Sequence, residues 1–110
     1  MNEIRLLGRI TADLELRKSQ NDRPYVWFTV AVPKRNDRDQ ADFVRCVAFD
    51  KLAEALEKHC TKGRQILVNG RLEVSQRVNP ITNINQTYYS VISDGIEFLQ
   101  RPQTSASQVN

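Results

Sequence analysis

The chain has 110 residues, of which 40% are hydrophobic and 26% charged, so it is long enough for one domain with one core and too short for two. Sixteen Lys and Arg against thirteen Asp and Glu give a net charge of +3, a mild basic excess that is compatible with a polyanionic partner. No apolar run reaches the roughly 20 residues of a membrane helix and no signal peptide opens the chain, so we expect a cytoplasmic protein with no membrane partner.

The residue types that carry most enzyme chemistry are sparse. Cys46 and Cys60 are too far apart for a C-x-x-C motif and are expected to be buried free thiols. His59 is the only histidine, and the acidic residues are scattered among basic neighbours. We therefore expect no metal, no cofactor and no enzymatic activity, with a small-barrel nuclease as the enzyme alternative.

The first third of the chain predicts two strands. Residues 3–10 alternate, with Gly8 at a bend or at a close approach of another backbone. Residues 11–24 are polar and predict a turn or a ragged continuation of the first strand, followed by a loop. Residues 25–32 predict the second strand, with its even-numbered apolar residues inward and Trp27 outward.

Residues 33–40, PKRNDRDQ, predict a mobile loop between two strands. This loop is either a solvated hairpin tip or a segment that surrounds nucleic acid. In the second case the contacts come from its basic residues Lys34, Arg35 and Arg38.

Residues 41–51, ADFVRCVAFDK, predict a third strand with two different faces. The inner face is small and apolar. Single-stranded nucleic acid suits the opposite face, because bases stack on rings and phosphates pair with basic groups. The alternative is a strand buried on both faces with its arginine at the rim. The opposite face carries Phe43, Arg45, Val47 and Phe49, and Lys51 follows directly.

A helix is expected over residues 51–62, with Asp50 as its cap and Gly63 ending it in a left-handed conformation. Its narrow apolar stripe contains Leu52, Ala53, Leu56 and Cys60.

The last third of the chain predicts two more strands joined by a hairpin loop over residues 78–87. The fourth strand alternates, with Leu72 and Val74 expected to continue the inward set of Ile66 and Val68. The fifth strand covers residues 88–99 and is expected to break or to bulge at Asp94-Gly95.

This order predicts an all-β fold, a five-stranded OB-fold barrel (an oligonucleotide/oligosaccharide-binding barrel) with one α-helix between strands 3 and 4. A small open sandwich is the alternative. Residues 1–100 form the predicted domain, and residues 101–110 are expected to be a disordered polar tail.

Several segments resemble, in order and spacing, the successive motifs of bacterial single-stranded DNA-binding proteins. The resemblance spans residues 1–100. It implies the same barrel, a homotetramer, and sequence-independent binding and protection of single-stranded DNA in replication, recombination or repair. The segments are MNEIRLLGRITADLELR, FTVAV, ADFVRCVAFDKLAE, KGRQILVNGRLE and IEFL.

The resemblance also implies roles for individual residues. Phe43 and Phe49 match positions that usually bear base-stacking aromatics, and Arg45 matches a basic position between them. Lys51, Lys62 and Arg64 are either contacts to the nucleic-acid backbone or ordinary solubilising charges. The remaining candidates for nucleic-acid contact are Trp27, Arg71 and Arg77.

Other positions depart from the family pattern. Asn36 and Arg77 stand where the family often has rings, and Glu73 stands where it often has a basic residue. The planar guanidinium of Arg77 can still stack, whereas Glu73 repels phosphate. Trp27 compensates for the missing rings if it borders the groove, but a subunit interface would use it as readily.

Family members that act in replication typically end in an acidic tip that recruits repair and replication enzymes, and no acidic residue follows Glu97 here. We therefore do not expect this recruitment, and the chain resembles a short accessory, phage or plasmid form. A barrel that binds RNA, tRNA or a primosome-type partner remains an alternative, which a preference for RNA over a thymidine oligomer would indicate.

Overall fold

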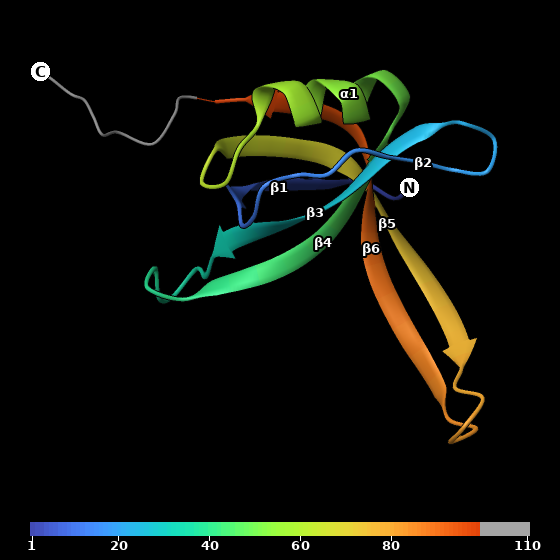
Figure 1. Ribbon diagram of the computed structural model, residues 1–110. Helices are drawn as coiled ribbons and strands as arrows, with labels where there is room; N and C mark the ends of the chain where they lie inside the picture. The colour runs from blue at the N-terminus through green and yellow to red at the C-terminus, as the bar shows by residue number, and fades with distance from the viewer. Residues whose placement is uncertain (100–110) are drawn as a thin grey trace, which may run out of the picture.

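The computed structural model describes residues 1–99, which form a barrel with one helix and a projecting arm (Figure 1). The predicted tail, residues 101–110, lies outside the described residues. The strands are β1 (Ile4–Ile10), β2 (Arg17–Lys18), β3 (Pro24–Pro33), β4 (Ala41–Phe49), β5 (Gln65–Val78) and β6 (Asn85–Phe98), and the helix is α1 (Asp50–His59).

Five of the strands close into a ring. Their order is β1-β5-β6-β4-β3, and the ring closes where Arg9 and Ile10 of β1 pair with β3. Neighbouring strands are antiparallel except β4 and β6, which are parallel. This arrangement, with α1 between the third and fourth strands of the ring, confirms the predicted OB-fold barrel and excludes the open sandwich.

The short strand β2 pairs with the start of β3 outside the ring. Its two residues are exposed and carry no apolar alternation, so the pattern of residues 11–24 did not predict a separate strand. The pairing depends on the turn that follows, in which the Ser19 side chain accepts a hydrogen bond from the backbone N–H of Arg23 at 3.2 Å.

The core fills the barrel, and α1 covers one end of it (Figure 1). Both thiols are buried and unpaired, as predicted. Burial raises the pKa of Cys46 to about 12 and also raises the pKa of Cys60, which the nearby Arg64 charge partly opposes. The buried cluster consists of Ile10, Val26, Phe28, Val30, Cys46, Ala48, Ala53, Leu56, Cys60, Ile66, Val68 and Val91.

The helix ends differ from the prediction. Asp50 makes no capping hydrogen bond, because its carboxylate instead accepts hydrogen bonds from Arg23. The helix stops at His59, since Cys60 is extended and its side chain is buried in the core. Gly63 has the expected positive φ of 91°, but it lies in the turn after the helix, where its N–H donates to Ile10. The capping and termination roles predicted for Asp50 and Gly63 were therefore wrong.

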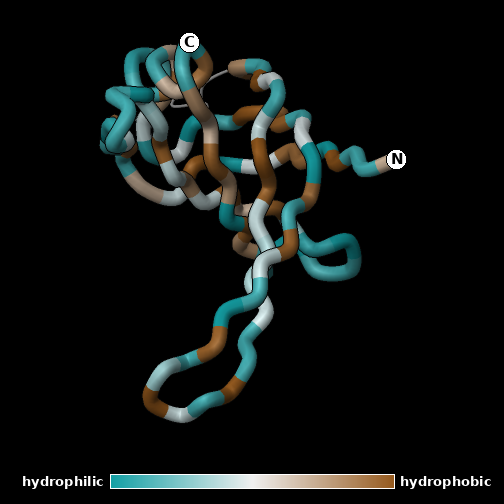
Figure 2. The backbone as a smooth tube through the Cα atoms, turned by 90° about the vertical axis from the view of Figure 1, so that its right-hand side faces the viewer, coloured by the Kyte–Doolittle hydropathy of each residue, from teal (hydrophilic) through white to brown (hydrophobic). Residues whose placement is uncertain are grey.

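Beyond the barrel, β5 and β6 continue together as a two-stranded arm, residues 73–90 (Figure 2). The turn is shorter than predicted, because pairing continues to Val78 and Asn85. Leu72 and Val74 were predicted to be inward, which was wrong: they are 38% and 52% exposed, since the strand pair has left the core.

A bulge lies at the base of the arm, just before residue 73. Asn69 pairs with Gly95 and Gly70 pairs with Ser93, so Asp94 is the extra residue. This confirms the predicted bulge, which bends and twists the strand pair. Gly70 is required here because a Cβ would collide with the Ile92 carbonyl.

Candidate nucleic-acid interface

The outer face of β3 and β4 follows from their register. Residues directly opposite each other in a sheet project to the same side. Cys46 and Ala48 of β4 are buried in the barrel, so the alternate residues of β4 and their partners project outward. The outward pairs are Phe43 with Ala31, Arg45 with Thr29, Val47 with Trp27, and Phe49 with Tyr25.

The same face continues onto the arm. Ile92 of β6 lies opposite Val47 of β4, and further along the arm Glu73 pairs with Ser90 and Ser75 pairs with Tyr88. The register therefore makes one continuous surface, here called the outer face, from β3 through β4 and β6 to the arm. Its aromatic members are Tyr25, Trp27, Phe43, Phe49 and Tyr88.

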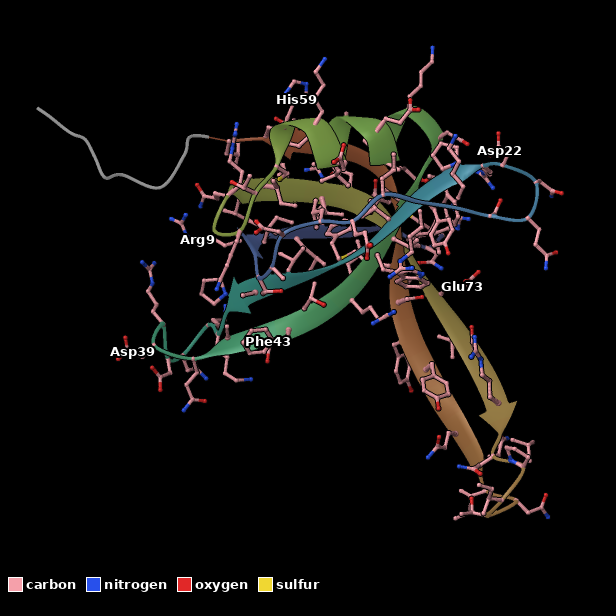
Figure 3. All side chains as sticks on the ribbon, viewed as in Figure 1. Arg9, Asp22, Asp39, Phe43, His59 and Glu73 are labelled. Carbon is pink, nitrogen blue, oxygen red and sulfur yellow. The ribbon has the colours of Figure 1, made fainter. Side chains whose placement is uncertain are left out.

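Phe43 is the most open ring on the outer face. It is 69% exposed and lies near the end of β4 that adjoins the loop 34–40 (Figure 3). Val47, assigned to the same face, is only 1% exposed, because it lies between Trp27 and Ile92 in the sheet. A base can therefore stack on Phe43, while Val47 supports its neighbours.

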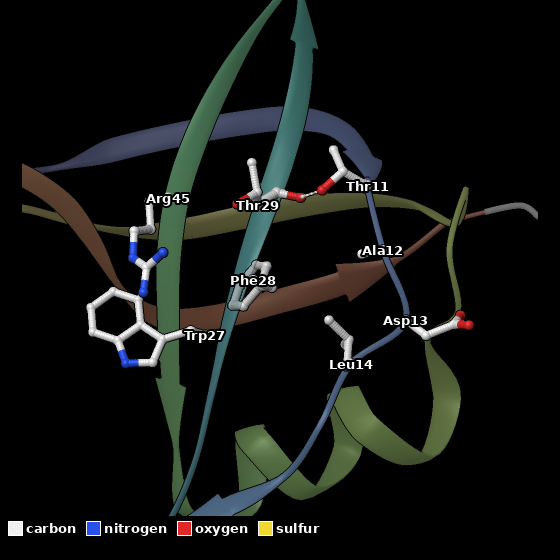
Figure 4. A pocket seen from close by; sticks show the side chains of 8 residues that line it. All are labelled: Thr11, Ala12, Asp13, Leu14, Trp27, Phe28, Thr29 and Arg45. Carbon is white, nitrogen blue, oxygen red and sulfur yellow. Dashed lines mark hydrogen bonds between the residues drawn. The ribbon is translucent and has the colours of Figure 1, made fainter.

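Trp27 and Arg45 form a stacked pair (Figure 4). The Arg45 guanidinium carbon lies 4.4 Å from the centroid of the Trp27 ring, which is 41% exposed. A cation over an indole face is attracted by about 0.5–2 kcal/mol, so the contact fixes the orientation of both groups. A small pocket of about 130 Å³ adjoins the pair beside Thr11 and Leu14, and a cleft of about 410 Å³ separates the pair from the arm.

Phe49 lies in a more crowded setting than Phe43. The Arg23 guanidinium carbon is 4.4 Å from its ring centroid, and the Tyr25 ring centroid is 6.4 Å away. Arg23 Nε also donates to both carboxylate oxygens of Asp50, at 3.0 and 3.1 Å. A base that stacks on Phe49 therefore has to move Arg23 or stack beside it.

Sequence reasoning missed Arg23, Tyr25 and Tyr88 as parts of this surface. Arg23 lies in a polar loop, and only the register of β3 with β4 brings it and Tyr25 beside Phe49. Tyr88 is 49% exposed and lies 5.7 Å from the Arg77 guanidinium carbon. The alternation of residues along β6 would have placed Tyr88 on the outer face if the register of β5 with β6 had been known.

The predicted basic residues outside β4 lie in the loop 34–40, at or just beyond the two ends of α1, and on the arm and at its base. Arg35 and Arg38 lie in the exposed loop and form no ion pair within residues 1–99, whereas Lys34 is paired with Asp42. Lys51 is exposed in the first turn of α1, and Arg71 lies at the base of the arm, 3.4 Å from Asp94.

Lys62 and Arg64 follow α1. The backbone N–H of Lys62 donates to Asp13, and its side chain is exposed. Arg64 donates to the Leu99 carbonyl at 2.8 Å and to the His59 carbonyl at 3.3 Å. Two of the five N–H groups of the Arg64 guanidinium therefore tie chain segments together, and the other three are left for a phosphate.

Within the described part of the chain, no cluster of three or more His, Cys, Asp or Glu residues could hold a metal ion. None of the described helices has the length and apolar character needed to cross a membrane.

The fold and the outer face together define a class, an OB-fold protein with exposed rings and guanidinium groups along one side of the barrel. Comparison with known families gives the particular one, because residues 1–99 match the model of the "Single-strand binding protein family". The chain belongs to this family, whose members are DNA-binding proteins and not enzymes.

Relatives in three bacteria carry the name single-stranded DNA-binding protein. The chain is 41% identical to the one from Fusobacterium nucleatum over 97% of its own length and 72% of the relative. It is 35% identical to the one from Thermotoga maritima, over 91% of the chain and 74% of the relative. The chain is 34% identical to single-stranded DNA-binding protein 1 from Staphylococcus aureus, over 98% of the chain and 71% of the relative.

Proposed function

We propose that the chain binds and protects single-stranded DNA, without requiring a fixed sequence, during replication, recombination or repair in the cytoplasm. The observation that carries this proposal is the continuous outer face, on which exposed rings alternate with guanidinium groups. Successive bases stack on such rings whatever their identity, and the arginines contact the phosphates between them. Membership of the family supports the same function.

The loop 34–40 supports this proposal. It lies beside Phe43 at one end of the outer face, and its two unpaired arginines, Arg35 and Arg38, are exposed. In the proposed complex these arginines contact the strand as it leaves Phe43. The ion pair of Lys34 with Asp42 leaves that lysine a smaller share of the contact.

We further propose that the chain assembles as a homotetramer. Residues 4–8 of β1 have β5 on one side and no partner strand on the other within residues 1–99. An unpaired strand edge is a template for pairing with another chain. Leu7, on the same segment, is 47% exposed and gives this edge an apolar side chain to bury.

Binding is tested by titrating the protein with a thymidine oligomer while the fluorescence of Trp27, the only tryptophan, is recorded at several salt concentrations. We expect quenching, and an affinity that falls steeply with salt because each phosphate contact releases counterions. Arg35→Ala and Arg38→Ala should each reduce the slope of log affinity against log salt by up to about one. Lys58→Ala, an exposed charge change on α1, is the matched control.

Salt-independent binding would exclude phosphate contacts from the mechanism. A uridine oligomer is the alternative ligand, which represents RNA. Tighter binding of uridine than of thymidine oligomers would assign the outer face to RNA, and no binding of either would overturn the proposed function.

A further inference from the structure

The cleft between the barrel and the arm is a site separate from Phe43. Its volume of about 410 Å³ lies within the range of about 300–1,000 Å³ that is usual for small-molecule sites. Trp27 and Arg45 line its barrel side, and Tyr88 and Arg77 line its arm side. The cleft therefore has an aromatic ring and a guanidinium group on each side.

Both sides of the cleft are organised in the same way. Arg45 lies 4.4 Å from the Trp27 ring centroid, and Arg77 lies 5.7 Å from the Tyr88 ring centroid. Each pair presents a flat surface together with a positive charge. Rings and guanidinium planes are the groups on which nucleic-acid bases stack, so the cleft suits a base whose phosphates stay beside the arginines.

The cleft also contains an acidic side chain, that of Glu73. Glu73 lines it at the point where the arm leaves the barrel (Figure 3), together with the hydroxyl groups of Ser75 and Ser90. Glu73 forms no ion pair or hydrogen bond through its side chain among residues 1–99, although Arg45 and Arg77 line the same cleft. A carboxylate repels phosphate, so it disfavours the nucleic-acid backbone at this point and leaves the position to a base.

A carboxylate only accepts hydrogen bonds. Cytosine, adenine and guanine each carry an amino group that donates, and an acidic side chain accepting from cytosine N4 is an established form of base recognition. Thymine carries carbonyl oxygens on either side of its only ring N–H, and these are repelled by a carboxylate. Glu73 therefore distinguishes bases with an amino group from thymine.

We propose that this cleft is a nucleobase subsite that favours an amino-bearing base over thymine through Glu73. The inference rests on the proposed binding of single-stranded DNA. It adds a preference among the four bases at one position along the bound strand. The strand is still bound without a fixed sequence, because Phe43 and the other rings accept any base.

The test compares the affinities of the full chain for cytidine and thymidine deoxy-oligomers of equal length, in the wild type and in Glu73→Gln. Removing the negative charge should raise both affinities. The ratio of cytidine to thymidine affinity should fall by about fivefold, since a glutamine can also donate to a thymine oxygen. Intrinsic differences between the two oligomers cancel when this ratio is compared between proteins. Glu54→Gln on α1 is the matched charge control and should leave the ratio unchanged.

A second pair of variants tests the aromatic side chain on the arm side of the cleft. Tyr88→Ala should weaken binding of both oligomers about fivefold or more, since it removes a stacking surface. Tyr89→Ala removes a ring that is more exposed than that of Tyr88, 63% against 49%, from the opposite face of the arm, and it should have no effect. Trp27 could serve the cleft or a contact between subunits, and sedimentation of Trp27→Ala distinguishes the two roles. If Trp27 serves the cleft, the oligomer of this variant should have the same mass as the wild-type oligomer.

The outcomes separate the two proposals. If the wild type binds neither oligomer, the proposed function itself fails. If it binds both and Glu73→Gln leaves the affinity ratio unchanged, only the base-selective subsite is overturned. A loss of mass in Trp27→Ala, with unchanged binding in Tyr88→Ala, would assign the cleft to a subunit contact and overturn the subsite as well.

Discussion

The two phenylalanines of β4 that lie on the outer face differ in their exposure to solvent. Phe43 is 69% exposed, while Phe49 is half-buried, with Arg23 over its ring and Tyr25 beside it. A truncation at Phe49 thus removes both a stacking surface and packing contacts, and its effect on binding would be mixed with an effect on stability. Phe43 is the better probe of the stacking mechanism.

Phe43→Ala should weaken binding of a thymidine oligomer by about 1–3 kcal/mol, which is the range for losing one stacked base. The free energy of unfolding should change by no more than about 0.5 kcal/mol, as for most exposed side chains. Equilibrium titration and urea unfolding measure the two quantities. Val74→Ala, an exposed apolar residue that alternates to the opposite face of the arm, is the control. Wild-type affinity in Phe43→Ala would place the stacking platform elsewhere on the outer face.

Cys46 gives the fold a dependence on alkaline pH. Its pKa is about 12 in the folded chain and 9.0 in an unfolded one, because burial disfavours the thiolate. The unfolded chain therefore binds fewer protons between these values, and the stability that the neutral buried thiol contributes is present below pH 9 and lost as the pH rises towards 12.

Cys46→Ala should be less stable than the wild type at neutral pH because it leaves a cavity. Since the variant lacks the titrating thiol, the difference in unfolding free energy should narrow above pH 9, by up to about 1.4 kcal/mol per pH unit. Urea unfolding of both proteins at a series of pH values measures this difference. A constant gap would mean that the thiol ionises equally in both states.

At the scale of elements, the arm is what the alternating pattern of β5 did not predict. Leu72 and Val74 continue the period of Ile66 and Val68, so the pattern alone extends the core along the whole strand. The barrel is too short to cover them, and the bulge at Asp94 turns the strand pair away from it. Alternation identifies the face of a strand but not how far the core reaches along it.

Two glycines at this bulge offer a matched test. A Cβ on Gly70 would collide with the Ile92 carbonyl, whereas a Cβ on Gly95 would have no atom within 4 Å. Gly70→Ala should therefore lower the free energy of unfolding by about 1–3 kcal/mol, the usual effect of overpacking, and Gly95→Ala should change it by less than about 0.5 kcal/mol. Thermal and urea unfolding measure both. Equal stabilities would show that the arm can shift to accept the methyl group.

At the scale of the whole molecule, the barrel could be predicted because the inner faces of its strands consist largely of alternating apolar residues, and because the loop 34–40 and the helix separate successive strands. The outer face could be predicted only in part. Phe43 and Arg45 lie on one strand, so their alternation brings them together. The pairing of Trp27 with Arg45, and of Tyr88 with Arg77, depends on contacts between strands that no local pattern encodes.

The assembly is the remaining property of the whole molecule. If two chains pair through the unpaired edge of β1 and a second contact joins two such dimers, sedimentation should give four times the chain mass of 12.7 kDa. Leu7→Lys should lower this mass while the circular dichroism of the barrel is retained, because a charge on an edge strand opposes pairing with a second strand. Ile81→Lys is the control, since Ile81 is 91% exposed and lies in the turn between β5 and β6, at the tip of the arm, which points away from β1 (Figure 1). Dissociation by Ile81→Lys and not by Leu7→Lys would assign the contact between chains to the arm.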